Sequence, residues 1–340
     1  MINKNELINN IKKLPAANSL RVLSIIDTVM QLSDNFIGVT ELRLLHLVRK
    51  GTLLTPKLIS NVKQRETILF HPQVRYALTQ MIFKYTDLDM DLPHEIPDIK
   101  IWEDILTILL QMSDMIYAKS HEIHGLKSYM LQASQFMVEE NWSSELLRTY
   151  EQYVVVAPTV SQDLDSGEAI DLMGIVQKTF GTSLRELFAN EVALFIYIQN
   201  QYNERPSEDA VPTTAYVGSV LLDQNKTLKS LMEQFSVRFN EFKKNLEQYS
   251  FEQLLWPIRH FKQTPILQLQ SVYIPLGLAF FIRRMGGGMY YSLIDNVPHN
   301  KKRQFQSYIG RVFEEWAISE LRNVYPDQSR IEFFERYVSK

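Results

Sequence analysis

The feature that most restricts the fold is the recurrence of apolar residues at spacings of three and four positions. The clearest run steps by three, four, four, three, four and three along residues 228–249, through Leu228, Leu231, Phe235, Phe239, Phe242, Leu246 and Tyr249. Such spacing places the apolar side chains on one face of an α-helix. The sequence therefore predicts a long helix here, which packs within the chain or forms a coiled-coil seam with a partner.

The same spacing recurs through most of the chain, and glycine is rare, with 12 in 340 residues. Rare glycine suits helices, because a glycine inside a helix costs about 1 kcal/mol relative to alanine. Further helices are predicted within residues 1–50, from 72, and over 101–117, 142–153, 169–180 and 184–198. The predicted fold is mainly α, a multi-helix bundle with more than half of its residues helical.

Two helix ends carry specific signals. Gly181 is predicted to end one helix in the left-handed conformation. Ser183 and Glu186 have the spacing of a capping box that opens the next helix. That next helix has apolar residues on more than one face, which predicts a place in the middle of the bundle.

Three prolines interrupt the helical pattern near the C-terminal third. Pro257, Pro265 and Pro275 exclude one continuous helix, and apolar residues flank them. We expect a buried, irregular or partly extended passage here, with at most a few short strands near residues 264–294. Glycines at 286–288 then predict a tight turn rather than a phosphate loop, because the Walker lysine pattern is missing.

The polar stretch at residues 204–212 is the best linker in the sequence. It suggests an N-terminal helical domain over 1–204 and a C-terminal helical region over 213–340. The division is soft, and the chain can equally form one domain.

Cysteine content, net charge and apolar runs exclude several classes of site and protein. The chain has no cysteine, which excludes disulfides, thiol nucleophiles and thiolate metal sites. A net charge of -3 is not that of a nucleic-acid polycation. The polar N-terminus is unlike a signal peptide, and the longest uncharged apolar run, 273–282, is too short to span a bilayer. We expect a cytoplasmic protein that does not contact a membrane.

Three acidic or histidine clusters resemble metal sites but lack the required spacing. The aspartates at 87, 89 and 91 have no glycine turn or closing glutamate, and those at 163 and 165 have a glycine one position early. The histidines at 121 and 124 are three apart, not four as in zinc proteases. We predict loops at the aspartates, no metal and no cofactor.

The most basic region runs from residue 283 to residue 322. If nucleic acid binds, we expect phosphate contacts from the basic side chains of this region, namely Arg283, Arg284, Lys301, Lys302 and Arg303. The neighbouring Tyr290 and Tyr291 would then stack on bases. The alternative is structural: the arginines pair with acids such as Asp295 and stabilise the turn.

The last predicted helix carries one apolar stripe, formed by Phe305, Tyr308, Ile309, Val312, Phe313 and Trp316. Steps of 100° place Glu314 opposite this stripe and Glu320 on it. Glu320 therefore lies near a frayed helix end or faces a polar pocket.

Residues 170–324 resemble the helical region ahead of nuclease-like domains in bacterial restriction and phage-defence proteins. The resemblance rests on the junction at 180–187, Pro265 with Pro275, the turn at 283–286 before two tyrosines, and the motif Gly-Arg-Val-Phe-Glu-Glu at 310–315. In that architecture this motif opens a fold similar to PD-(D/E)XK nucleases. Glu314 matches the motif's glutamate and is the one candidate catalytic residue that the resemblance implies.

The sequence departs from such nucleases after this helix. The strands with an aspartate and a Glu-x-Lys pair, which hold Mg²⁺, are not found in residues 325–340. Either the nuclease domain was lost, or the chain is the front part of a larger protein, or the resemblance misleads.

Two functions follow. The first is a non-catalytic helical scaffold or sensor in a multi-protein defence system, working as a homo-oligomer or a subunit. The second is a nuclease-related or nucleic-acid-binding component whose catalytic part is lost or supplied by a partner. We expect no nuclease activity from this chain alone.

Overall fold

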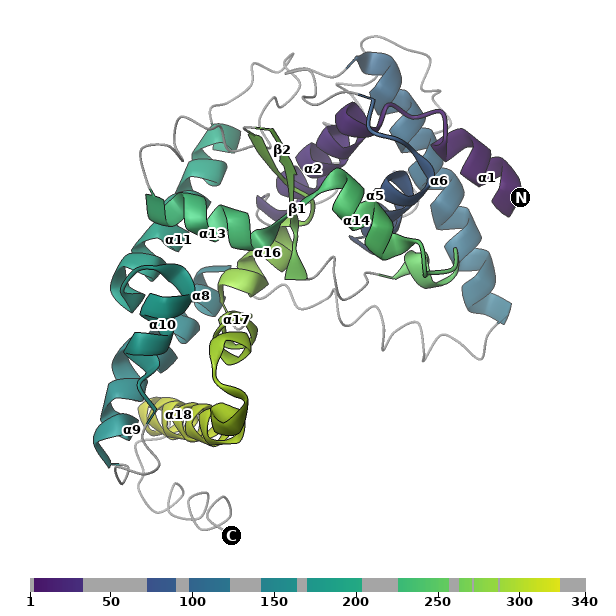
Figure 1. Cartoon of the computed structure of the whole chain (residues 1–340). Coiled ribbons are helices and arrows are strands. Elements are labelled where there is room, and N and C mark those ends of the chain that lie inside the picture. Colours follow the sequence, from purple (N-terminus) through teal and green to yellow (C-terminus); the bar gives the residue numbers. More distant parts are fainter. Residues whose placement is uncertain are drawn as a thin grey trace. The chain divides into compact units, whose positions relative to one another are not determined.

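A computed structural model describes residues 3–32, 72–89, 98–122, 142–163, 170–203, 226–256, 263–270, 272–286 and 288–324 (Figure 1). The chain is mainly α-helical, as the apolar spacing predicts, with one small sheet. It divides into two compact units, each built from two separate stretches: residues 1–139 with 193–281, and 140–192 with 282–340. We call them unit 1 and unit 2. The linker predicted at 204–212 lies outside the described residues, and the units divide the chain at other positions.

Unit 1 packs helices from its first stretch against a strand-containing second stretch. The helices of the first stretch are α1 (Lys4–Ile11), α2 (Ala16–Leu32), α5 (Pro72–Tyr85) and α6 (Ile99–Glu122). The second stretch contains α13 (Lys226–Phe235), β1 (Ser236–Arg238), α14 (Phe239–Leu246), the 3-10 turn η3 (Gln253–Leu255), β2 (Ile266–Leu269), β3 (Val272–Pro275) and the first half of α16 (Leu278–Met285).

The three strands form one sheet in the order β1-β2-β3, with β1 parallel to β2 and β2 antiparallel to β3. The positions of β2 and β3 agree with the predicted partly extended passage. The single long helix predicted over 228–249 is wrong, because β1 interrupts it between α13 and α14. Ser236 pairs with Ile266 in the sheet, so backbone pairing with a distant strand overrides the local helical pattern.

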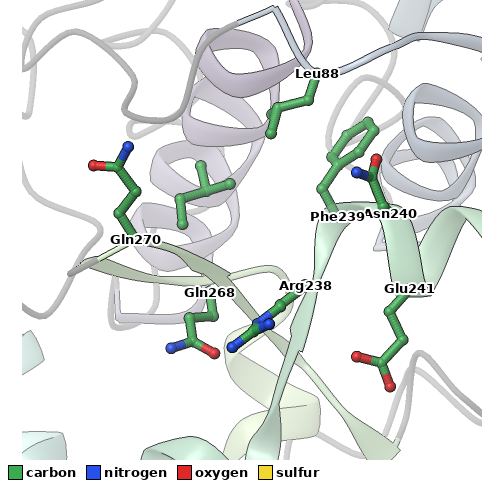
Figure 2. Close-up of a pocket in the computed structure, with 8 residues that line it drawn as sticks. Leu88, Arg238, Phe239, Asn240, Glu241, Gln268 and Gln270 are labelled. Atoms are coloured by element: carbon green, nitrogen blue, oxygen red, sulfur yellow. The ribbon is translucent and has the colours of Figure 1, made fainter.

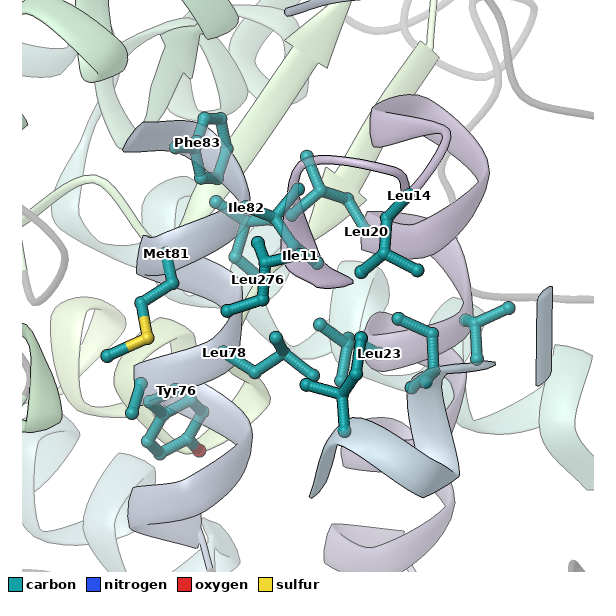
Figure 3. Close-up of a cluster of buried hydrophobic side chains, with 14 of the residues drawn as sticks. Ile11, Leu14, Leu20, Leu23, Tyr76, Leu78, Met81, Ile82, Phe83 and Leu276 are labelled. Carbon is teal, nitrogen blue, oxygen red and sulfur yellow. The ribbon is translucent and has the colours of Figure 1, made fainter. Parts of the chain in front are cut away.

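The core of unit 1 is apolar and almost completely buried. Figure 3 shows Leu20 and Leu23 of α2 facing Leu78 and Ile82 of α5, with Leu276 from the segment after β3 among them. All five side chains are 1% exposed or less, apart from Leu276 at 2%. The helices of the first stretch therefore share one core with the sheet segment of the second stretch.

One ion pair lies inside this core. Asp27 accepts hydrogen bonds from Nε and Nη2 of Arg75, at 3.1 and 2.7 Å, and both side chains are 2% exposed. The second carboxylate oxygen of Asp27 accepts a 2.7 Å bond from the backbone N–H of Leu278, at the start of α16. Asp27 thus joins α2, α5 and α16.

The predicted loop is confirmed at Asp87 and Asp89, whereas the loop predicted at Asp163 is wrong, because this residue ends the helix α9 (Ala157–Asp163). Asp87 pairs with Lys243 at 2.5 Å, and Asp89 accepts a 3.0 Å bond from the backbone of Ala17. Residue 91, the histidine at 124 and the aspartate at 165 lie outside the described residues, and nothing is described of the side chains of His121 and Asp163.

Unit 2 begins with a nearly continuous helical stretch. It consists of α8 (Trp142–Tyr150), the π-helix η2 (Glu151–Val156) and α9 (Ala157–Asp163). The unit continues with α10 (Leu172–Phe180), the start of α11 (Leu184–Asn203), the end of α16, α17 (Met289–Asn296), the 3-10 turn η4 (His299–Lys301) and α18 (Lys302–Val324). None of the described helices in either unit combines the length and apolar character of a membrane span.

The predicted helix ends of unit 2 are confirmed. Gly181 has φ 73° at the end of α10. The Glu186 carboxylate accepts from the backbone of Ser183, whose hydroxyl accepts from the backbone of Glu186, each at 3.3 Å. The prediction that α11 lies in the middle of the bundle is wrong for its described side chains: Leu187 and Glu191 are buried, whereas Val192 is 37% exposed and Ile196 is 43% exposed.

Candidate functional site

Arg283 and Arg284, the first two of the predicted basic residues, lie in the last turn of α16, just before the glycine turn. Arg284 donates a 2.9 Å hydrogen bond from Nη1 to the carbonyl of Gly288. Burial lowers the pKa of Arg284, and the charge of Asp295 acts against this shift. A Cβ at Gly288 would lie 2.7 Å from the carbonyl oxygen of Arg283, so the turn requires glycine there. Arg284 therefore forms part of the turn.

The two tyrosines of α17 lie in different surroundings. Tyr290 is half-buried and stacks on Phe305 of α18, with ring centroids 5.9 Å apart. Tyr291 is 57% exposed, with its ring 5.2 Å from that of Tyr290. Tyr291 is thus the tyrosine of this pair with a face open to a ligand.

The remaining predicted cations gather at the start of α18. Lys301 and Arg303 are exposed and Lys302 is half-buried. The first turn of α18 contains no acidic residue. The N-terminus of a helix already carries a partial positive charge, so three cations there produce a concentrated positive potential. This end of α18 suits a phosphate or carboxylate group.

The apolar stripe of α18 is partly buried. Phe305, Tyr308 and Val312 are at most 2% exposed. The prediction places Phe313 on this stripe, but Phe313 is 56% exposed because it lies about 100° around the helix from Val312. Glu314 is exposed, as expected for a residue opposite the stripe, and Glu320 is half-buried near the helix end.

Polar contacts hold α18 against the first stretch of unit 2. The Tyr308 hydroxyl donates a 2.8 Å bond to the carbonyl of Ala157 and lies 2.7 Å from Oγ of Ser161. Trp316 donates from Nε1 to the carboxylate of Glu151 at 3.2 Å. Burial raises the pKa of Tyr308, whereas its bond with Ser161 lowers it. These contacts fix which face of α18 points outward.

Large exposed apolar side chains are concentrated in unit 2. Among the described residues, eight of the nine lie there: Leu147, Tyr150, Val155, Met173, Val192, Tyr291, Phe313 and Val324, whereas Ile196 of α11 belongs to unit 1. Sequence analysis did not identify Leu147, Val155 or Met173. The available signal was their position beside the buried stripe of each helix, where a polar residue is the usual choice.

Unit 1 contains a pocket of about 550 Å³ beside the sheet, lined by Leu88, Arg238, Phe239, Asn240, Glu241, Gln268, Leu269 and Gln270. Figure 2 shows Arg238 pointing toward Gln268, and Glu241 follows one turn later on α14. The pocket offers amide groups and one guanidinium for hydrogen bonding. Its lining has one cation, Arg238, and one acid, Glu241, so its net charge is zero, whereas the start of α18 carries three cations.

In the part of the chain that the structure describes, no three His, Asp or Glu residues are grouped to hold a metal ion. Comparison with protein-family models, curated proteins and solved structures finds no match.

Proposed function

We propose that the chain is a non-catalytic helical scaffold or sensor subunit of a bacterial, phage-defence-like multi-protein system in the cytoplasm, and that unit 2 binds its protein partners. The observation that carries this proposal is the concentration of exposed apolar side chains in unit 2. Leu147 is 58% exposed, Val155 is 56% and Met173 is 47%. Exposed apolar groups of this size favour association, because their burial is worth about 25 cal/mol for each Å² removed from water.

The proposed partner surface of unit 2 combines exposed apolar side chains with charged ones. Charged groups surround the apolar ones: Arg148 follows Leu147, and Glu151 lies one turn from both Leu147 and Val155. Interfaces between proteins commonly have an apolar centre with a polar rim. A complementary partner would present an apolar patch with its own mixed charges. The resemblance of residues 170–324 to the helical part of phage-defence proteins supports placing this partner within a defence complex.

The test uses the double variant Leu147→Asp, Val155→Asp. Tagged parent and variant chains are expressed at equal levels in the native host, crosslinked and purified, and phage plating efficiency is measured in parallel. We expect the parent chain to co-purify with a specific protein and to reduce phage plating efficiency. The variant should do neither. The exposed polar double variant Lys178→Asp, Thr159→Asp is the control and should retain both. Parent chains without a partner or a plating effect would contradict the proposal.

A second candidate function is nucleic-acid binding, favoured by the three cations at the start of α18. Replacing Lys301, Lys302 and Arg303 by serine should abolish binding in a gel shift. About three phosphate contacts imply a log-log salt slope of about -2.7 for duplex DNA. The control removes the same charge elsewhere, with Lys12, Lys13 and Lys178 changed to serine, all of which are exposed. Equal binding by both variants would reject these cations as the site.

The nuclease-related form of this candidate is tested by cleavage. We expect the purified chain with Mg²⁺ or Mn²⁺ to leave a supercoiled plasmid intact, because the expected Asp and Glu-x-Lys ligands are not present in the sequence after α18. Cleavage that Glu314→Ala abolishes would restore an enzymatic function.

A further inference from the structure

The outward face of α18 has a regular pattern of its own. Its residues step by three, four, three, four, three and four: Arg303, Gln306, Gly310, Phe313, Ala317, Glu320 and Val324. These steps are those of a heptad seam, in which one helix packs along another. The buried residues of α18, Phe305, Tyr308 and Val312, lie outside the row. Phe313 is 56% exposed and Val324 is 65% exposed, whereas Ala317 and Glu320 are half-buried, so five of the seven row positions are open.

Gly310 occupies the middle of this row. A Cβ built at Gly310 meets no atom within 4 Å, so packing within the chain does not require glycine there. Glycine in a helix interior costs about 1 kcal/mol relative to alanine. With Ala317 two turns later, Gly310 leaves a shallow surface on either side of Phe313. Small residues of this kind allow a second helix to approach closely.

The charge along α18 reverses near its middle. The stretch 301–311 carries Lys301, Lys302, Arg303 and Arg311 and no acid, whereas 314–322 carries Glu314, Glu315 and Glu320 against Arg322. The first part is therefore +4 and the second -2. Two such helices repel at both ends when parallel and attract at both ends when antiparallel. On the row itself the charged residues are Arg303 near one end and Glu320 near the other, so two antiparallel rows are complementary in charge.

We propose that this face of α18 binds α18 of a second copy of the chain, antiparallel, about a two-fold axis between Phe313 and Glu314. In this register Gly310 faces Ala317 of the second copy, which places small residues opposite each other. Arg303 faces Val324 and lies about one turn from Glu320 of the second copy. The same patch serves both copies, as in other two-fold interfaces. This inference rests on the proposed function, because it names a second copy as one partner of unit 2.

The register is tested with single cysteines, which are unambiguous because the chain has none. A disulfide needs Cβ atoms about 3.5–4.5 Å apart, so only positions beside the axis can link to themselves. Under mild oxidation we expect Phe313→Cys, which lies on the row beside the axis, to form a covalent dimer. Arg303→Cys alone and Val324→Cys alone should not, but an equal mixture of the two should. Equal self-linking of all three would indicate a parallel pair, and no linking at any position would contradict contact; both outcomes overturn the proposal.

The charge pairing is tested by reversal and rescue. Arg303→Glu and Glu320→Arg should each weaken the dimer about tenfold, because each removes two symmetry-related pairs worth up to about 1 kcal/mol apiece. The double variant should restore dimerisation, measured by light scattering or sedimentation. If both single variants weaken the dimer and the double variant does not restore it, the antiparallel register is wrong.

Gly310→Leu separates folding from association. The longer side chain has open space in the single copy, so the variant should unfold no more easily than the parent. It should nevertheless raise the dimer dissociation constant at least tenfold by holding the helices apart. A strict monomer at every concentration of the parent chain would overturn the pairing. The proposed function would survive that result if the Leu147→Asp, Val155→Asp variant still lost another protein.

Discussion

Units 1 and 2 use hydrophobic side chains in opposite ways. In unit 1 the apolar residues of α2 and α5 are buried around an ion pair whose two partners are each 2% exposed. In unit 2 the helices bury one stripe each and leave Leu147, Val155 and Phe313 more than half exposed. Unit 1 therefore satisfies its apolar groups internally, whereas unit 2 presents apolar groups that a partner would cover. If unit 2 binds a partner as proposed, stability and recognition belong to different parts of the chain.

The largest effect is expected from Asp27→Ala in unit 1. The substitution leaves the Arg75 guanidinium buried without its carboxylate and removes the acceptor for Leu278, so the free energy of unfolding should fall by about 3–5 kcal/mol. Urea unfolding measures the loss, and hydrogen exchange should locate it in residues of unit 1. Lys4→Ala is the matched control, because it breaks the exposed pair with Glu252 and should cost at most about 1 kcal/mol. Equal losses would refute the contrast between buried and exposed pairs.

The next effect concerns Glu191 of unit 2, whose side chain is buried without a hydrogen-bond partner for Oε2. Burial raises the pKa of Glu191 well above its ordinary value. The folded state therefore holds a proton that the unfolded chain releases above about pH 4.3, so stability should fall as the pH rises from there toward the raised pKa. Glu191→Gln should remove this loss, so the variant should be more stable than the parent at neutral pH.

The matched variant is Glu186→Gln, because the pKa of Glu186 is lowered by bonds from Thr182 and Ser183. Its contribution is present above the ordinary pKa and disappears as the pH falls through the lowered one. Glu191→Gln and Glu186→Gln should therefore have opposite signs at pH 7, measured by unfolding between pH 4 and pH 8. If both variants change the free energy of unfolding in the same direction at pH 7, the Glu191 carboxylate is stabilised in the folded state, contrary to this prediction.

A smaller effect is expected where α18 meets α9. Tyr308→Phe removes the hydroxyl that donates to Ala157 and contacts Ser161, and it should cost about 1–2 kcal/mol. Tyr291→Phe alters an exposed ring and should leave the free energy of unfolding almost unchanged. Chemical denaturation followed by tryptophan emission measures the free energy of unfolding of both variants. A cost for Tyr291→Phe equal to that for Tyr308→Phe would show that exposure does not separate them.

The last prediction concerns two glycines of unit 2, whose substitutions should change the free energy of unfolding in opposite directions. Gly181→Ala forces alanine to φ 73° and should cost about 1–2 kcal/mol. Gly310→Ala adds a methyl group in open space inside a helix and should stabilise the single copy by up to about 1 kcal/mol. Thermal unfolding at one concentration compares the two. A stabilising Gly181→Ala would contradict the conformational requirement at that position.

The sequence predicts the helices well because their apolar stripes are local. It predicts the caps at Gly181 and Ser183 for the same reason. It misses β1, because Ser236 pairs with Ile266, a residue with no local relation to it. It places Phe313 on the buried stripe, because a helical-wheel projection shows which residues share an apolar face but not which part of that face packs against another helix. The role of Arg284 depends on a turn whose geometry only the structure supplies.

The interleaving of the two units has a consequence during synthesis on the ribosome. Unit 1 needs residues 193–281 to complete the core that α2 and α5 begin, and unit 2 needs α18 to cover η2 and α9. At ordinary elongation rates, roughly ten seconds separate the emergence of the two stretches of unit 1. During that interval the apolar core residues of the first stretch lack their packing partners and are accessible to chaperones. A truncation at any one position between residues 140 and 281 also leaves unit 1, unit 2 or both without one of their stretches, so each unit must be produced by joining two segments.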